Sequence, residues 1–105
     1  MDRWMAGSNG FTRTNKEQQE VAAETAKGGT LVQVAIVYQG QRITIYRTGK
    51  KYSDYRVEGP EKFVDDSIAL IGLRHRDAGP NNRFFTGSIE DARIYDIPLS
   101  AAQIA

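Results

Sequence analysis

A dense run of β-branched residues at 30–38 (TLVQVAIVY) is the feature that most constrains how this chain can fold. In an extended strand, alternate side chains point to opposite faces of the sheet. One face of the run carries Val32, Val34 and Ile36, and the other carries mainly apolar residues beside Gln33. Because both faces are mainly apolar, the pattern predicts a central strand of a packed sheet.

Two further extended segments follow at short intervals. A turn at 39–40 leads to residues 41–47 (QRITIYR), where apolar and polar side chains alternate, and a turn at 48–49 leads to residues 50–57. Alternating segments joined by short turns that contain glycine are typical of β-hairpins. The sequence therefore predicts an antiparallel β-meander over 30–57.

The rest of the chain shows no long periodic helix. Residues 15–29 are polar and end in two glycines, so we expect either a short exposed helix or a loop. Residues 68–73 (IALIGL) and 84–95 (FFTGSIEDARIY) are predicted strands, and Ser100 is expected to cap a short helical turn at 101–105. Together these elements predict an all-β fold, an antiparallel β-sandwich or barrel.

Length and composition place few further limits on function. The 105 residues suit a single domain spanning 1–105, and 14 basic against 13 acidic residues give a net charge of +1. This balance gives no argument for a nucleic-acid partner. The absence of cysteine excludes disulfides and thiolate metal sites. No apolar run approaches the roughly 20 residues that cross a bilayer, so we expect no membrane insertion.

The stretches LVQVAIVYQG, ITIYRTGK and FTGSIEDARIYDIPLSAAQIA follow one another between residue 31 and the end of the chain. They resemble the laminin-G-like (concanavalin A-like lectin/glucanase) family, whose closing segment has the pattern F-x-G-x-I-D-D-V-R-I-Y. The resemblance covers residues 30–105. The opening RWMAGSNGFTRT resembles, more narrowly, modules of planctomycete-type multidomain proteins. It implies a concanavalin A-like jelly roll that binds a glycan or protein ligand within a larger extracytoplasmic protein, periplasmic or secreted.

The chain departs from the family pattern in ways that bear on assembly. Leu31 replaces a Trp of the family, and Thr48 replaces the Asn of an Asn-Gly hairpin. Because Thr tolerates positive φ poorly, we expect the turn type to change. Family domains are also longer, which implies a jelly roll shortened at its N-terminus and open sheet edges. A homo-oligomer, or an N-terminal portion of the parent protein, would cover such edges. A structural or assembly module that oligomerises through them is the alternative function.

No catalytic constellation is evident in the sequence. Glu90 and Asp91 are adjacent, so in a strand they point to opposite faces and cannot form the pair of carboxyls, roughly 5–10 Å apart, that glycoside hydrolysis needs. Asp91 is better explained as a structural partner of Arg93 or of loop backbone. His75 has neither clustered metal ligands nor a nucleophile motif beside it. The sequence predicts a protein that is not an enzyme, with a glycoside hydrolase as the weaker alternative.

Aromatic rings beside hydrogen-bond donors make up a typical sugar-binding surface, although aromatic residues also pack in cores. Oxygen-rich loop positions raise Ca²⁺ as a possible cofactor, held by Asp77 and Asn81, with ordinary turn chemistry as the competing explanation. The predicted ligand-binding residues are Trp4, Arg47, Tyr52, Tyr55, His75, Arg76 and Asn82.

Overall fold

The computed structural model describes residues 3–6, 21–58, 62, 65, 67–71, 85 and 87–105. The chain divides into two compact units, of which the first is Met1–Glu61 with Asp96–Ala105 and the second is Lys62–Tyr95. The first unit contains all the strands and the helix that the described residues form.

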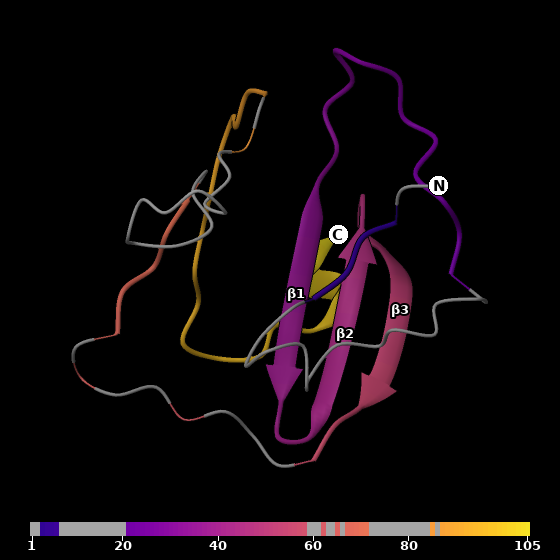
Figure 1. Cartoon of the computed structure of the whole chain (residues 1–105). Coiled ribbons are helices and arrows are strands. Elements are labelled where there is room, and N and C mark those ends of the chain that lie inside the picture. The colour runs from indigo at the N-terminus through magenta and orange to yellow at the C-terminus, as the bar shows by residue number, and fades with distance from the viewer. Residues whose placement is uncertain are drawn as a thin grey trace, which may run out of the picture. The chain divides into compact units, whose positions relative to one another are not determined.

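The first unit is built on a three-stranded antiparallel meander, in the order β1-β2-β3 (Figure 1). Its strands are β1 (Val34–Gln39), β2 (Arg42–Arg47) and β3 (Lys50–Arg56). The predicted meander and the all-β class are therefore confirmed. Among the described strands β1 has β2 as its single neighbour, so the central position predicted for the 30–38 run stays a prediction.

Both hairpin turns use positive φ. Gly40 has φ 58° between β1 and β2, and Thr48 and Gly49 have φ 49° and 77° between β2 and β3. In the β2–β3 turn both central residues, Thr48 and Gly49, have positive φ. This is the pattern of a type I′ turn, which suits the twist of a hairpin. The expected change of turn type therefore does not occur. Thr48 adopts the left-handed conformation instead, and its N–H donates to Gln33 O at 2.8 Å.

The core lies on one face of the meander, against the N-terminal segment that crosses the front of the sheet in Figure 1. Ile43 and Ile45 of β2 have no exposed surface, and Ala6 packs with them. β2 is buried because it has a strand on each side and the N-terminal segment above it. Several half-buried side chains complete the cluster: Trp4, Val34, Tyr52, Tyr55 and Val57.

A β-bulge in β3 places Tyr52. Ile45 is opposite Ser53 while Tyr46 is opposite Lys51, so Tyr52 is the extra residue of β3 at this point. Such a bulge re-aims a side chain and increases the local twist. Tyr52 thereby reaches the N-terminal segment and the loop at residues 21–26.

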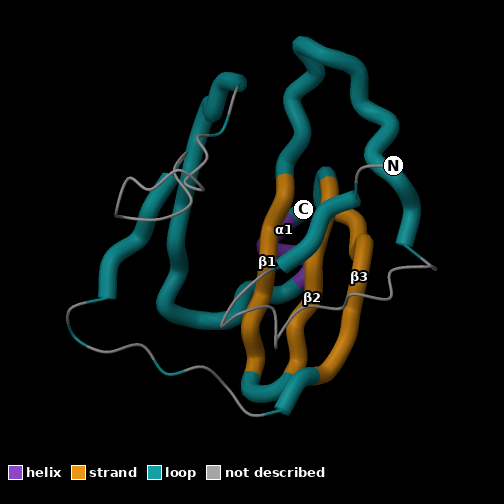
Figure 2. Tube along the Cα trace, in the orientation of Figure 1, coloured by secondary structure: helices purple, strands orange, loops and turns teal. Residues whose placement is uncertain are grey.

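The helix α1 (Ala101–Ile104) lies behind the sheet in Figure 2. The predicted cap is confirmed: Ser100 accepts from Gln103 N, and Gln103 bonds back to Ser100 N. Ile104 is buried. A Cβ at Gly49 would lie 3.2 Å from the Cα of Ala105, so the hairpin turn meets the end of the chain closely.

The remaining sequence-based elements have mixed outcomes. Within the described part of 15–29, residues 21–29 form a loop that ends in a turn, where Thr30 N donates to Lys27 O at 3.1 Å. In the second unit, the described residues of 68–73 and 84–95 belong to no strand, so those two predictions are wrong for the residues concerned. A strand requires a hydrogen-bonded neighbour, and these segments have none among the described residues.

Candidate functional site

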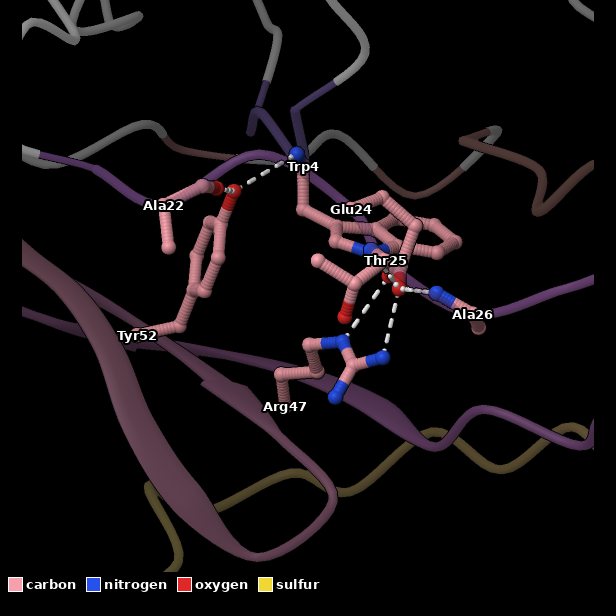
Figure 3. Close-up of polar contacts among 7 residues, drawn as sticks. All are labelled: Trp4, Ala22, Glu24, Thr25, Ala26, Arg47 and Tyr52. Atoms are coloured by element: carbon pink, nitrogen blue, oxygen red, sulfur yellow. Dashed lines mark hydrogen bonds and ion pairs between the residues drawn. The ribbon is translucent and has the colours of Figure 1, made fainter.

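The carboxylate of Glu24 is the centre of the most connected polar cluster among the described residues (Figure 3). Arg47 Nε donates to Glu24 Oε2 at 2.8 Å, and a second guanidinium nitrogen bonds the other oxygen. Trp4 Nε1 also donates to Oε2. The backbone N–H groups of Thr25 and Ala26 donate to Oε1 at 2.8 and 2.7 Å. One carboxylate thus joins the 21–26 loop, the N-terminal segment and β2.

The hydrogen bonds from Arg47, followed by the one from Trp4, hold the pKa of Glu24 well below its usual range, although burial acts in the opposite direction. The same pairing raises the pKa of Arg47. Both side chains are largely covered, with 17% of Glu24 and 28% of Arg47 exposed. A bidentate, charge-assisted pair in such surroundings is a strong local link. The charge of Arg47 is therefore balanced by the carboxylate of Glu24 within the same molecule.

Tyr52 makes the second link between the loop and the sheet. Its hydroxyl donates to Ala22 O and accepts from Trp4 N at 3.2 Å (Figure 3). Nearby, Arg3 Nε donates to Val21 O at 2.9 Å. We call the residues joined by the Glu24 and Tyr52 contacts (Trp4, Ala22, Glu24, Thr25, Ala26, Arg47 and Tyr52) the clasp. The clasp fixes the 21–26 loop over one end of the meander.

A second ionic cluster lies on the face of the β2–β3 hairpin that is opposite to the clasp. Arg42 Nε donates to Asp54 Oδ1 at 2.7 Å, and a second guanidinium nitrogen bonds Oδ2. Lys51 Nζ lies 3.6 Å from the same Oδ2. The hydrogen bond from Arg42, opposed by burial and helped by the nearby charges, lowers the pKa of Asp54 to about 2. This cluster ties the two strands together across the hairpin.

The structure brings together three of the predicted ligand-binding residues, Trp4, Arg47 and Tyr52, but the interactions that it shows are internal. Tyr55 lies opposite Ile43 and packs against the core. The rings of Trp4, Tyr52 and Tyr55 are half-buried and pack against the core cluster, and their role in ligand binding stays a prediction. The other predicted residues lie outside the described residues: His75, Arg76, Asp77, Asn81 and Asn82.

Sequence reasoning missed Glu24. A lone acidic residue in a polar loop has no pattern that marks it. One signal was available, because Arg47 follows Ile43 and Ile45 on the apolar face of β2. A guanidinium on a buried face needs a partner, so an acidic residue elsewhere in the chain was required.

Asp91, near the end of the chain, forms an ion pair. Asp91 Oδ2 accepts from Arg93 Nε at 2.8 Å, which confirms the predicted pairing of Asp91 with Arg93. Within the described residues, no three His, Asp or Glu side chains gather to hold a metal ion. In the same part of the chain, no helix has the length and apolar character to span a bilayer.

The two outer strands of the meander differ in exposed chemistry. β1 has the sequence VAIVYQ, without a charged residue, and Ile36 and Tyr38 remain 42% and 44% exposed. β3 carries four charged residues among its seven. Within the described residues no further strand pairs with either one. Among the described strands, β1 is therefore the uncharged outer strand of the meander.

The antiparallel meander and the single short helix put the described part of the chain in the all-β class, consistent with a β-sandwich. The family model described as "Concanavalin A-like lectin/glucanases superfamily", of the laminin-G type, matches residues 3–105. The chain belongs to this family, and its fold is the concanavalin A-like jelly roll.

Comparisons with individual proteins add one structural relative. No curated protein matches the chain. The chain is similar to the crystal structure of an S-layer domain-containing protein from Clostridium thermocellum ATCC 27405, with 27% identity and a TM-score of 0.64. The match covers 79% of this chain and 41% of that one, so the chain spans about two fifths of the solved relative.

Proposed function

We propose that this chain is a non-catalytic binding module of a larger extracytoplasmic protein and that its ligand is a protein segment. The observation that carries the proposal is that β1, an outer strand among the described strands, has no charged residue and leaves 42% of Ile36 exposed. A sheet edge offers a row of backbone N–H and C=O groups to an extended peptide, and pockets for alternate side chains supply specificity.

A glycan ligand is supported less well by the same geometry. Trp4, Arg47 and Tyr52 belong to the clasp, where the indole N–H, two guanidinium nitrogens and the hydroxyl bond other groups of the same molecule. A sugar-binding surface needs donors and acceptors that are available to hydroxyl groups, together with an accessible ring face.

An enzymatic role has no support from the described carboxylates. Asp91 is paired with Arg93, and Glu90 is its immediate neighbour in the chain. An extracytoplasmic location is supported by the family and by the S-layer domain-containing relative.

Two binding screens on the full chain test the proposal. Phage displaying random 12-residue peptides report on protein ligands, and a glycan array with calorimetric titration reports on sugars, each with Ca²⁺ and with EDTA. We expect selected peptides with alternating apolar residues that bind the chain and lose binding to Ile36→Lys. Glycan binding without peptide binding would overturn the choice of ligand. Silence in both screens, or cleavage of any glycan, would overturn the binding-module proposal.

A further inference from the structure

The end of the meander next to the β1–β2 turn carries two opposed arginines. The register sets Gln39 of β1 opposite Arg42 of β2, and Arg42 opposite Arg56 of β3. Side chains that are directly opposite on neighbouring strands share one face of the sheet. Two guanidinium groups and one amide therefore form a row across the three strands, on the face that is opposite to the clasp.

The hydrogen bonds of the β2–β3 hairpin bring the two arginines close together. Val57 N donates to Gln41 O at 2.8 Å, so Gln41 and Val57 form a hydrogen-bonded pair. Arg42 and Arg56 form the adjacent pair, which is not hydrogen-bonded. The Cα atoms of such a pair are about 4.5 Å apart, and its side chains lie closer than those of a hydrogen-bonded pair. Because like charges directly opposite each other repel, this arrangement favours a negative group beside it.

Asp54 supplies that negative charge to Arg42. It accepts hydrogen bonds from two nitrogens of Arg42, and Lys51 Nζ lies 3.6 Å from it. Arg56 is exposed and has no ion pair within the described part of the chain. Three positive charges and one negative charge thus leave this face of the hairpin with a net charge of +2. Burial of a guanidinium without a counter-ion is costly, so Arg56 faces water or an anionic partner.

We propose that Arg56, together with the part of the Arg42 guanidinium that Asp54 does not occupy, binds carboxylate side chains of an acidic segment of another protein. A guanidinium has five N–H donors, and Asp54 bonds Nε and one terminal nitrogen of Arg42, which leaves the other terminal nitrogen for a ligand. The inference goes beyond the proposed function, because it places a separate contact on the other face of the meander and does not depend on β1.

The surroundings of the arginine pair favour a carboxylate over a sugar or a phosphate. A planar guanidinium matches a carboxylate with two parallel hydrogen bonds. A phosphate monoester carries nearly twice the negative charge of a carboxylate, so the nearby Asp54 opposes it more strongly. A sugar site normally includes an aromatic ring face. No aromatic ring occurs in the two rows of side chains that form this surface: Val37, Gln39, Arg42, Thr44, Asp54 and Arg56.

Fluorescence anisotropy of a labelled peptide, titrated with the full chain at low ionic strength, tests the site. The probe is the pentapeptide Glu-Gly-Glu-Gly-Glu, and the same peptide with glutamine in place of glutamate is its control. We expect the acidic peptide alone to bind, and added salt to weaken the binding. Arg56→Gln should raise the dissociation constant at least roughly threefold. Lys27→Gln removes the same charge from an exposed residue outside the meander, so it should leave the constant close to that of the parent chain.

Asp54→Asn supplies a change in the opposite direction. This substitution removes the carboxylate that competes for Arg42, so we expect the dissociation constant for the acidic peptide to fall at least roughly threefold. Glu90→Gln removes one negative charge from an exposed residue of the second unit and should have little effect. Fluorescence of the single tryptophan, Trp4, checks that each variant is folded.

The outcomes separate a specific site from an effect of net charge. Equal weakening by Arg56→Gln and Lys27→Gln, or no binding of the acidic peptide to the parent chain, would overturn the site. Tighter binding of a phosphoserine peptide or of an oligogalacturonate than of the acidic peptide would overturn the choice of ligand. A chain that selects displayed peptides through Ile36 but ignores the acidic peptide would overturn this inference and leave the proposed function standing.

Discussion

At the scale of single residues, Thr48 combines a β-branched side chain with a positive φ of 49°. Threonine is disfavoured in this region, whereas Asn enters it readily. We expect Thr48→Asn to raise the free energy of unfolding by about 1 kcal/mol, because it relieves backbone strain at the type I′ turn. Urea denaturation measures the change. Thr30→Asn is the control, since Thr30 lacks a positive φ. A loss of stability in Thr48→Asn alone would show that the threonine side chain contributes more than its backbone strain costs.

Glu24 determines a second residue-scale property, the response to acid. Its pKa is lower in the folded chain than the 4.5 expected of the unfolded chain. The unfolded state therefore binds more protons in acid, and stability must fall as the pH drops below about 4.5. Asp54, with its pKa lowered to about 2, acts in the same direction.

We expect Glu24→Gln to destabilise the chain at pH 7 and to flatten the dependence of stability on pH below 4.5. Urea denaturation at a series of pH values measures both effects. Glu58→Gln serves as the control, because the structure shows no ion pair for this exposed residue within its described part. An unchanged acid slope in Glu24→Gln would mean that the clasp does not hold the carboxylate ionised.

At the scale of elements, the 21–26 loop depends on contacts from the sheet, since it has no regular structure of its own. Tyr52→Phe removes the hydroxyl that bonds Ala22 O and Trp4 N. We expect a loss of about 1 kcal/mol and a change in the fluorescence of Trp4, because the hydroxyl contacts two segments. Tyr46→Phe is the matched control on the neighbouring strand. Equal effects of the two substitutions would contradict a specific role for the bulged tyrosine.

The helix α1 has four residues, so its stability must come from docking and from its cap. Ile104 is 7% exposed, whereas Ile97, in the segment before the helix, is 58% exposed. Ile104→Ala should lower the free energy of unfolding by about 2 kcal/mol, and Ile97→Ala should have little effect. Calorimetry compares the two variants. A cost at Ile97 as large as that at Ile104 would show that the buried face has been wrongly assigned.

Local patterns predicted the elements whose determinants are close together in sequence. Residues 30–57 contain the alternation and turns of the meander, and Ser100 with Gln103 contains the whole capping box. The role of Glu24 depends on Trp4 and Arg47, which are 20 and 23 residues away, so no local pattern specifies it. For the same reason the apolar pattern of 30–38 indicated a strand but not the number of its neighbours. Sequence spacing also did not predict the internal hydrogen bonds of Trp4, Arg47 and Tyr52, three of the predicted ligand-binding residues.

At the scale of the whole molecule, the alternative function, a module that assembles through open sheet edges, predicts that stability depends on protein concentration. If folded copies pair and unfolded chains do not, association stabilises the folded state by mass action. Each tenfold rise in concentration then adds about 1.4 kcal/mol per dimer, which corresponds to an increase of roughly 3 °C in Tm. Scanning calorimetry over a hundredfold concentration range measures this increase.

Two matched lysine variants, Ile36→Lys in β1 and Ile97→Lys outside the meander, make the same measurement decisive. Ile97→Lys should keep the rise of Tm with concentration, because this exposed residue lies outside the meander. Ile36→Lys should lose it and should match the parent chain at the lowest concentrations, where the parent is monomeric. A lower Tm for Ile36→Lys at every concentration, with the slope retained, would instead assign Ile36 to the stability of the monomer. Because the two effects differ in slope rather than in size, the experiment separates an interface residue from a core residue without knowledge of the dimer's structure.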